Sequence, residues 1–383
     1  MEPLTEVPVI DVRAFLEKDP AKMLEQCRLV AQSLHEFGIL IWRDPRICEQ
    51  DNEDYLDMME EYFEYESRKH YNGEKLKDCK PEFNFQAGVT PERQERARNN
   101  KHVLEKLTPE NMPLSKFPPE LDAKWRFFWA IGERPAEVAE NIPKVVPTAF
   151  PEWEEKMNKW GNMMIQACFT AAEMAAMGMG LSPDTFTSKM NKGPHLLSPT
   201  GSDLQRYDVG TTFAGFHYDL NFLTIHGKSR FPGLFVWLRN MKKVSVKIPP
   251  GCLLLQAGSM FEHITGGYVL AGYHEVIYTE ATKAALEKAK QEIQEGKNRI
   301  LWRVSSTLFS HIRYDVDLSP MPEMAGFYDV AEAKAKYRKM TAHEKLMEEL
   351  QAINLAPAIK SAASAEGVSA ESSSLAQQMV STM

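Results

Sequence analysis

The feature that most constrains the fold is a change of texture between residues 197 and 315. Here short apolar and β-branched runs alternate with turn residues, whereas most of the remaining chain has helical spacing or no clear period. The turns are marked by Gly215, Gly227, Pro232-Gly233, Pro249-Pro250-Gly251 and Gly266-Gly267. Strands spaced this closely in one block predict a double-sheet jelly roll.

The N-terminal region is predicted to form a strand, a helix and a second strand. Residues 7–11 and 39–42 are short apolar runs. Residues 24–34 carry apolar side chains at helical spacing, and Gly38 follows them as a C-terminal cap. Residues from about 52 to 135 are charged, and we expect them to be mostly helical or looped.

Helices are also expected around and inside the β-rich block. An apolar stripe over residues 157–171 predicts a long helix, and residues 280–298 have the spacing of a helix inserted between two strands. A C-terminal helix is expected over 328–356. The Ser- and Ala-rich residues 357–383 would bury too little apolar surface to offset their ordering entropy, so we expect a disordered tail.

These segments predict an α+β chain. Residues 1–150 form an N-terminal region that packs on the core, and residues 151–327 form the core itself. With 383 residues, of which 43% are hydrophobic, the chain can bury one large core or two ordinary ones.

Composition also limits the partners that we expect. The net charge of −8 disfavours nucleic acid, and no apolar run is long enough to span a bilayer. The five cysteines are scattered and never spaced as CxxC, which is typical of reduced thiols inside cells. We therefore expect a cytoplasmic protein that is a monomer or weak homodimer.

The chemistry centres on the sequence Phe216-His217-Tyr218-Asp219-Leu220. Side chains alternate between the two faces of a strand, so His217 and Asp219 point the same way. If they point inward, an imidazole and a carboxylate converge inside the barrel. A lone His-x-Asp is a weak signal, because short motifs often arise by chance.

A third ligand would complete a triad of two histidines and one carboxylate, which is typical of non-haem Fe(II) oxygenases. The best candidate is His274, far enough downstream for several strands to return to the site. Two competitors remain: His263, at an expected strand end, and His226, beside the turn at Gly227. Such a triad leaves the opposite face of the metal open for oxygen and a cosubstrate.

Arg303 and Ser305 form a second pair with strand spacing, on the apolar run 300–309. A guanidinium binds a carboxylate through two hydrogen bonds, and a nearby hydroxyl can add another. If this face points inward, an anionic ligand would offset the cost of burying the charge. If it points outward, Arg303 is an ordinary surface charge.

In this order, the motifs resemble those of the isopenicillin-N-synthase-like branch of the 2-oxoglutarate and Fe(II)-dependent dioxygenases. The resemblance covers most of residues 7–315. It rests on the following segments: Val7-Pro8-Val9-Ile10-Asp11, Glu36-Phe37-Gly38-Ile39-Leu40, His217-Tyr218-Asp219, Pro232-Gly233-Leu234-Phe235-Val236, His274-Glu275-Val276 and Arg303-Val304-Ser305.

The resemblance implies a double-stranded β-helix (jelly-roll) core with flanking helices. It implies Fe(II) on His217, Asp219 and His274, and 2-oxoglutarate held through its distal carboxylate by Arg303 and Ser305. With molecular oxygen, such an enzyme releases succinate and CO2 while it hydroxylates, desaturates or cyclises a small-molecule substrate.

Tyr207 matches a tyrosine of the family that often binds the same carboxylate of 2-oxoglutarate, although it is as readily explained as a packed strand residue. Phe213, Phe309, Asn84 and Phe85 are candidates for the wall of the substrate pocket, and core packing is the alternative for each.

Three features depart from the family pattern. Asp208 and Val209 replace the usual prolines, and Glu275 replaces the usual arginine after the distal histidine. His274 and Arg303 are 29 positions apart, which the insertion at 280–298 explains. Two other functions remain open: an Fe(II) oxidase of the same fold that does not use 2-oxoglutarate, and a catalytically silent binding module.

Overall fold

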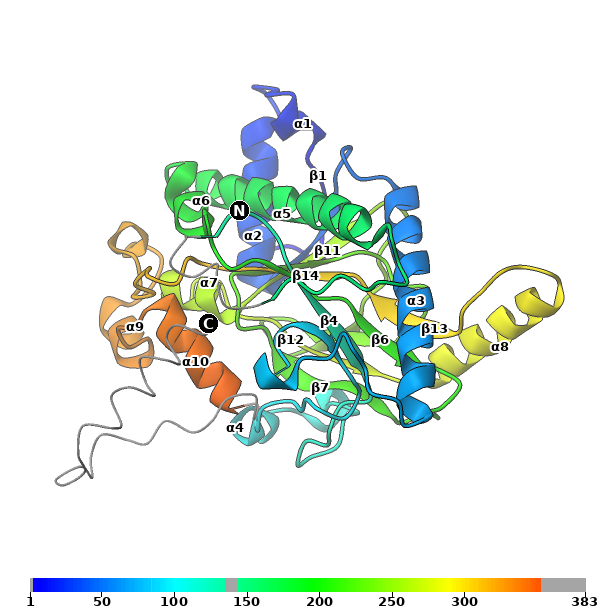
Figure 1. Cartoon of the computed structure of the whole chain (residues 1–383). Coiled ribbons are helices and arrows are strands. Elements are labelled where there is room, and N and C mark those ends of the chain that lie inside the picture. Colours follow the sequence, from blue (N-terminus) through cyan, green and yellow to red (C-terminus); the bar gives the residue numbers. More distant parts are fainter. Residues whose placement is uncertain (1–2, 84, 135–142, 353–383) are drawn as a thin grey trace, which may run out of the picture.

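Two β-sheets form the centre of the molecule, and helices cover the outer face of the larger one (Figure 1). The computed structural model describes residues 3–83, 85–134 and 143–352. In these residues the larger sheet has ten strands, in the order β1-β2-β11-β8-β14-β5-β4-β6-β13, with β3 paired to β4. The smaller sheet has the order β10-β9-β12-β7.

The strands are short. In the larger sheet they are β1 (Val9–Asp11), β2 (Ile39–Arg43), β3 (Gly88–Thr90), β4 (Trp125–Ala130), β5 (Leu196–Leu197), β6 (Thr200–Asp203), β8 (Leu223–His226), β11 (Leu253–Ala257), β13 (Trp302–Ser305) and β14 (Thr307–Ser310). In the smaller sheet they are β7 (Thr212–Tyr218), β9 (Leu234–Trp237), β10 (Lys243–Ser245) and β12 (Tyr273–Ile277). The predicted block of strands between 197 and 315 is therefore present.

The helices surround these sheets. They are α1 (Arg13–Leu16), α2 (Met23–Phe37), α3 (Glu49–Tyr71), α4 (Lys101–Leu104), α5 (Trp153–Gly178), α6 (Asp184–Met190), α7 (Ser259–Ile264), α8 (Glu280–Gln294), α9 (Val330–Lys336) and α10 (Ala342–Ala352), with 3-10 turns at Pro81–Phe83, Pro109–Asn111 and Pro322–Met324. None of the helices in the described part of the chain is both long and apolar enough to cross a bilayer.

The N-terminal strand–helix–strand unit forms one edge of the larger sheet. β1 pairs with β2 in parallel, and β2 pairs in turn with β11 from much later in the chain. Gly38 ends α2 with a φ of 72°, and its N–H donates to the carbonyl of Leu34. Glycine reaches this left-handed conformation without strain, so the predicted cap is confirmed.

Aromatic side chains fix the helical layer on the larger sheet. Trp125, Phe127 and Trp129 alternate along β4 and are all buried, because this face of the strand packs beneath α3 and α5. Phe127 contacts Tyr62 of α3 and Trp153 of α5, with ring centroids 5.4 and 4.7 Å apart. The other face of β4 is left for the space between the sheets.

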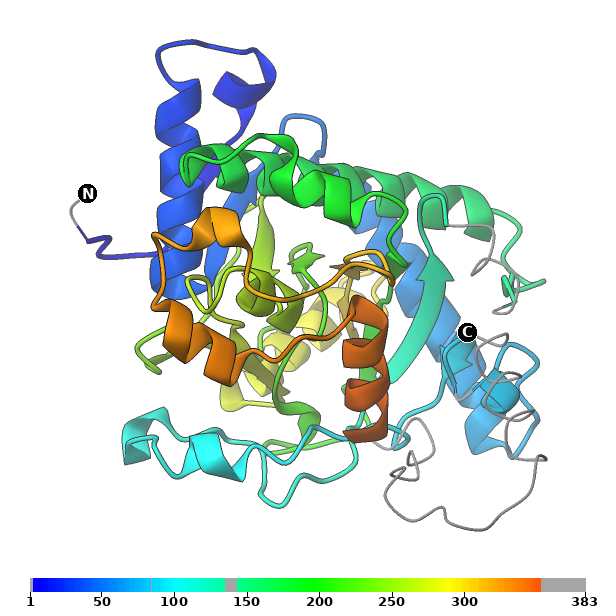
Figure 2. The same cartoon turned by 90° about the vertical axis from the view of Figure 1, so that its left-hand side faces the viewer.

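The inner faces of the two sheets also pack together. Ile41 and Leu254 of the larger sheet share a buried cluster with Val236 of the smaller sheet. Figure 2 looks along the sheets from one end of the molecule. At this end, the ends of the strands are surrounded by helices α4, α6, α7, α9 and α10.

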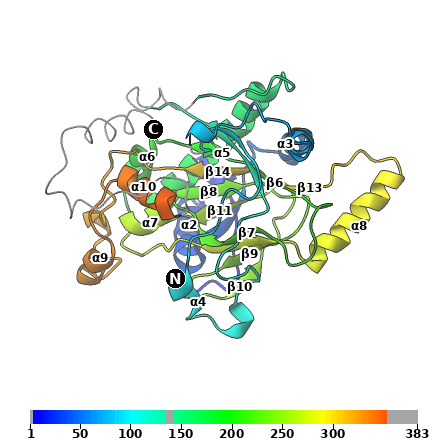
Figure 3. The same cartoon turned by 60° about the horizontal axis from the view of Figure 1, so that its bottom comes forward.

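The inserted helix is confirmed as α8. It projects from the body of the molecule on the side of β13 (Figures 1 and 3). Its buried residues Leu286 and Ala289 share a cluster with Phe213 and Tyr278. The same cluster contains Leu204 and Leu301, which directly adjoin β6 and β13 of the larger sheet, so residues beside both sheets anchor the insertion.

The charged region 52–135 is mostly helix and loop, as predicted, and it also contains the short strands β3 and β4. Two local predictions were wrong. His263 lies in α7 and not at a strand end. The single C-terminal helix over 328–356 is two helices, because Thr341 begins α10 by accepting a hydrogen bond from the backbone N–H of Glu344. The predicted tail at 357–383 lies outside the described residues.

Candidate metal centre

His217 and His274 lie opposite each other on the paired strands β7 and β12, and Asp219 follows directly after β7. Nε2 of His217 is 3.7 Å from Oδ1 of Asp219, and Nε2 of His274 is 3.8 Å from the same oxygen. Two atoms that each bind one ion at about 2.1 Å can be at most about 4.2 Å apart. The donor set and its spacing therefore fit a single metal ion.

Hydrogen bonds orient two of the three candidate ligands. Nδ1 of His217 lies 2.6 Å from the carbonyl oxygen of Gly215, so Nδ1 donates and Nε2 keeps its lone pair for a metal. Asp219 accepts a hydrogen bond of 2.6 Å from the hydroxyl of Thr224 at Oδ2, which leaves Oδ1 facing the histidines. Nδ1 of His274 is 3.3 Å from Nε2 of Gln256.

The burial of this cluster favours the protonation states that metals require. Burial lowers the pKa of His217, and burial with the neighbouring His217 lowers the pKa of His274 to about 4. For Asp219, burial alone would raise the pKa, but His274 and His217 together lower it below its usual value. At neutral pH the site thus offers two neutral imidazoles and one carboxylate.

The two competing histidines do not join this cluster. His217, Asp219 and His274 are the group of candidate ligands that the described residues bring together. His226 is buried at the end of β8, where Nε2 lies 3.1 Å from Oε1 of Gln256. His263 lines a separate pocket.

Arg303 points into the protein, as the inward-facing alternative requires. Its side chain is only 6% exposed, and Nε donates to the carbonyl of Pro232 at 3.2 Å. Burial alone lowers the pKa of this guanidinium to about 10. No ion pair joins Arg303 to an acidic side chain in the described residues, so it remains a buried cation without a protein carboxylate.

Ser305 and Tyr207 have other partners. The hydroxyl of Ser305 lies 3.0 Å from that of Thr307 on the next strand. The hydroxyl of Tyr207 donates to Glu92, and its ring contacts Phe213 edge-on at 6.1 Å. Of the three residues predicted to hold the cosubstrate, Arg303 therefore has the clearest unmet requirement for an anion.

A cavity of about 180 Å³ opens beside His217 and Asp219. Its apolar walls include Phe309 of β14 and Phe128 of β4, and Arg126 lies on the same face of β4 as Phe128. The guanidinium of Arg126 lies 5.5 Å from the ring centre of Phe128 and 5.8 Å from that of Phe309. The cavity is thus walled by aromatic rings beside a charged group.

Four charged side chains form a buried network on this wall. Arg126 pairs with Glu95 at 2.9 Å, and Lys124 pairs with Glu95 at 3.1 Å and with Asp122 at 2.6 Å. Asp122 also accepts a hydrogen bond from the backbone N–H of Gly215, which itself orients His217. The two cations and two anions balance, so this wall presents no net charge.

The C-terminal helix α10 forms another wall of the cavity. Leu346, Glu349 and Leu350 line it. Glu349 accepts hydrogen bonds from Arg98 at 2.7 Å and from the hydroxyl of Tyr218 at 3.1 Å. Because Tyr218 lies between His217 and Asp219 in the sequence, α10 is tied to the strand that carries two of the candidate ligands.

Only some of the residues predicted to line the substrate pocket do so. Phe309 lines the cavity as predicted. Phe213 does not: it is 2% exposed and packs against α8, where its ring fills the apolar cluster beneath the insertion. Phe85 is half-buried with a φ of 60° and does not line the cavity, although its neighbour Gln86 does. Asn84 lies outside the described residues.

Sequence reasoning missed Arg126, Phe128, Glu349 and the charged network. The signal for the first two was present, because Trp125-Arg126-Phe127-Phe128-Trp129 is a run of large β-forming residues with alternating faces. Glu349 gave no such signal, since its role depends on where α10 returns to the sheets.

No protein-family model matches the sequence, and no curated protein sequence matches it. Solved structures do match. A Caulobacter crescentus protein described as a 2OG-Fe(II) oxygenase family member superposes with a TM-score of 0.66 at 17% identity, over 91% of this chain and 99% of that one.

Two further structures contain bound ligands. A full-length Neurospora crassa protein, solved in complex with alpha-KG, matches with a TM-score of 0.67 at 18% identity, over 92% of this chain and 99% of that one. JOX2 in complex with 2OG, Fe and JA matches with a TM-score of 0.58 at 15% identity, over 91% of this chain and 86% of that one. At these identities, the comparisons show that the chain has the fold of these oxygenases.

Proposed function

We propose that this chain is a non-haem Fe(II)- and 2-oxoglutarate-dependent oxygenase of a small-molecule substrate. The observation that carries the proposal is the convergence of His217, Asp219 and His274 beside an aromatic-walled cavity. Two imidazoles and one carboxylate are the ligand set of the 2-His-1-carboxylate Fe(II) oxygenases. The proposal includes the double-stranded β-helix arrangement of the two sheets and membership of the isopenicillin-N-synthase-like branch.

The cosubstrate is assigned from the buried cation. Arg303 would bind the distal carboxylate of 2-oxoglutarate, and Ser305 would add a hydrogen bond if its hydroxyl turned from Thr307. Two solved structures with the same fold contain 2OG or alpha-KG, which supports this assignment. Tyr207 remains a candidate for the same carboxylate, although its hydroxyl first has to leave Glu92.

Once bound, the metal and 2-oxoglutarate would react with molecular oxygen to give an oxidant strong enough to attack a C–H bond. The 2-oxoglutarate would be converted to succinate and CO2. The protein supplies position and exclusion of water. Gly215 and Thr224 fix the orientation of His217 and Asp219 before any ligand arrives. Phe309 and Phe128 would hold an apolar part of the substrate beside the metal.

An anaerobic titration tests the proposal. Purified protein is given Fe(II) and then 2-oxoglutarate while the visible spectrum is recorded. A charge-transfer band that appears only after the second addition is expected, because it reports a keto acid chelating protein-bound iron. The Asp219→Ala variant is the control, and it should fold but give no band.

The other results decide between the remaining functions. Iron binding without a band, together with oxygen uptake that needs no 2-oxoglutarate, would identify an oxidase of the same fold. Failure of the wild type to bind iron would reject the oxygenase and leave a binding module.

A further inference from the structure

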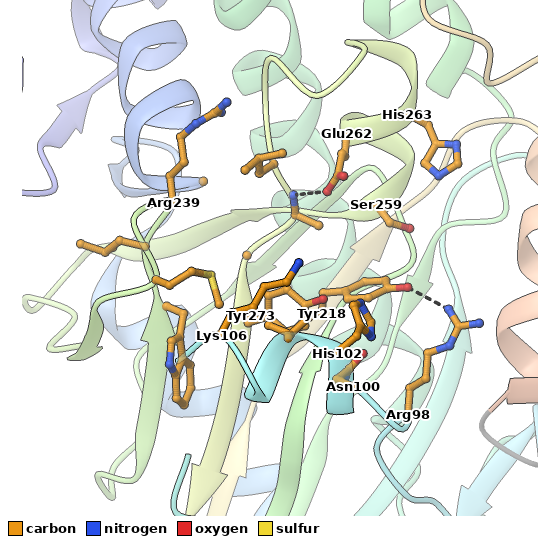
Figure 4. A pocket seen from close by; sticks show the side chains of 18 of the residues that line it. Arg98, Asn100, His102, Lys106, Tyr218, Arg239, Ser259, Glu262, His263 and Tyr273 are labelled. Carbon is orange, nitrogen blue, oxygen red and sulfur yellow. Dashed lines mark hydrogen bonds between the residues drawn. The ribbon is translucent and has the colours of Figure 1, made fainter. Parts of the chain in front are cut away.

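A second and larger pocket lies against the other side of β7. Its volume is about 430 Å³, within the range of small-molecule sites. Arg98, Asn100 and Tyr218 line both this pocket and the metal cavity, so they form the partition between the two. We name it the outer pocket. Figure 4 shows Tyr218 beside Tyr273 in its floor, with Arg98 hydrogen-bonded to the Tyr218 hydroxyl.

The charged residues of the outer pocket are mostly basic. Its lining includes Arg98, Lys106, Arg239, Lys336 and Lys345. Glu262 is the acidic residue among those that line it. This excess of cations contrasts with the net charge of −8 for the whole chain. A cleft with one sign of charge concentrates ligands of the opposite sign.

Most of these cations already have partners, and one is left over. Glu262 pairs with Lys336 at 3.2 Å, while Glu349 pairs with Arg98 at 2.7 Å and with Lys345 at 3.2 Å. Arg239 donates to the backbone carbonyls of His35, Tyr268 and Gly267, and its guanidinium is directed away from the pocket in Figure 4.

Lys106 is the remaining cation. No ion pair or hydrogen bond joins its ammonium to another side chain in the described residues. Its side chain extends across Tyr273 toward the middle of the pocket (Figure 4). His263 also lines the pocket, and its Nδ1 is buried with no hydrogen-bond partner in the described part of the chain. The pocket therefore offers both a free positive charge and a polar atom without a partner.

The rest of the lining is apolar. It includes Phe37, Val103, Trp237, Leu238, Met241 and Leu270. A free inorganic anion would leave these side chains without contacts, whereas an apolar body would cover them and remove their apolar surface from water, which favours binding. Charge and shape together thus call for an organic anion.

The geometry points to a second ligand site in the outer pocket, for a small organic anion with an apolar body and a carboxylate or phosphate head near Lys106. This site goes beyond the proposed oxygenase function, because His217, Asp219 and His274 do not line it. A bound anion would touch Arg98 and Tyr218, which also line the metal cavity.

Dye displacement tests this site without requiring iron or turnover. The probe is 8-anilinonaphthalene-1-sulfonate, an apolar anion whose fluorescence rises on binding. Saturable binding to one site is expected in the full chain. It should weaken about threefold or more in Lys106→Met and at least tenfold in Lys106→Glu, because the second change also adds repulsion. Lys283→Glu makes the same charge change on exposed α8 and should leave binding unchanged.

Competitors then identify the head group. Octanoate and octyl phosphate should each displace the dye at concentrations at least tenfold lower than neutral octanol does, and the stronger of the two names the preferred head. Equal displacement by octanol would contradict an anion site.

Two more results would overturn the site itself: no saturable dye binding, or binding that Lys106→Glu leaves unchanged. Loss of binding in Asp219→Ala would show that the dye occupies the metal cavity instead. Because the dye needs no metal, the site can be rejected while the oxygenase proposal survives, and the reverse also holds.

Discussion

At the scale of single residues, Arg303 has the largest unmet interaction. An ionised group that is buried without a counter-ion lowers stability by several kcal/mol. In the described residues, Arg303 meets one backbone carbonyl and no carboxylate. Such a residue is retained where a ligand supplies the missing charge, which is the role that we propose for 2-oxoglutarate.

Replacing Arg303 by Met should separate binding from stability. We expect the KM for 2-oxoglutarate to rise about tenfold to hundredfold, since hydrogen bonds to charged groups are worth about 1.5–3 kcal/mol. The free energy of unfolding of the ligand-free protein should stay level or rise, because the unpaired charge is gone. Steady-state kinetics and urea denaturation measure the two effects.

Arg299→Met is the matched control for that change. Arg299 lies four positions earlier, is partly exposed, and approaches Glu292 at 3.4 Å. It should leave the KM for 2-oxoglutarate unchanged. If the KM for 2-oxoglutarate rose strongly in Arg299→Met and not in Arg303→Met, Arg299 and not Arg303 would be the residue that binds the carboxylate.

Glu95 predicts a pH dependence of stability. Burial alone would raise its pKa, but Arg126 and Lys124 together lower the pKa of Glu95 from 4.5 to about 2. A lowered carboxyl pKa means that the ionised form stabilises the fold above pH 4.5, and that this stabilisation is lost as the pH falls toward 2. The full effect is about 3 kcal/mol.

Urea denaturation between pH 6 and pH 3.5 checks this dependence. The wild type should lose stability more steeply than Glu95→Gln, which should already be less stable at pH 6 because it leaves two buried cations underpaired. The exposed control Glu155→Gln should follow the wild type. Equal slopes for the wild type and Glu95→Gln would contradict the assigned role.

The metal ligands could be predicted from the sequence, whereas much of the cavity could not. His217 and Asp219 share a face because strand geometry depends only on spacing, and Arg303 followed from the same argument. Arg126 could not be predicted to line the cavity, because the face of β4 that carries it is known only once β4 is placed in the sheet. Glu95 and Glu349 come from loop and helix segments whose approach depends on tertiary packing.

At the scale of elements, α8 is an insertion that is anchored on one side only. Leu286 is 3% exposed and packs in the cluster that contains Phe213, while Ile293 on the same helix is 39% exposed. Removing apolar volume from a packed site leaves a cavity, and the same change at the surface does not.

Leu286→Ala should therefore lower the free energy of unfolding by about 2–4 kcal/mol. Ile293→Ala should change it by about 0.5 kcal/mol or less. Thermal and urea denaturation of the two variants measures the difference. Similar effects at both positions would mean that α8 does not dock as described.

Elements were predicted best where turn residues separate them. Between 197 and 315, glycine directly follows β8 and β11 and directly precedes β9 and β12, and the inserted helix has a clear period. β4 was missed because the charged segments around it obscure a six-residue strand. α7 was misread as a strand end, because six residues are too few for a helical period.

At the scale of the whole molecule, the larger sheet joins both halves of the chain. β1, β2, β3 and β4 come from the first 150 residues, and the other strands come from the later region. β2 pairs with β11, and β4 pairs with β5 and β6. The predicted boundary between an N-terminal region and a core therefore separates strands that are hydrogen-bonded to one another in a single sheet.

A single unfolding transition is expected from this sheet. Denaturation by guanidinium, followed by tryptophan fluorescence and by far-UV circular dichroism, should give coincident curves. Two separated transitions would show that residues 1–150 and the core unfold independently, as separate domains do.

The pairing of β2 with β11 also determines how long β2 lacks its partner strand while the chain is being translated. About 210 residues separate the end of β2 from the start of β11. At about 5–20 residues per second, a ribosome needs about 10–40 s to make that length. For this interval the apolar edge of β2 has no neighbour on its β11 side. The nascent chain thus carries an open strand edge that only its own later sequence can close, and whatever shields that edge has to act before translation ends.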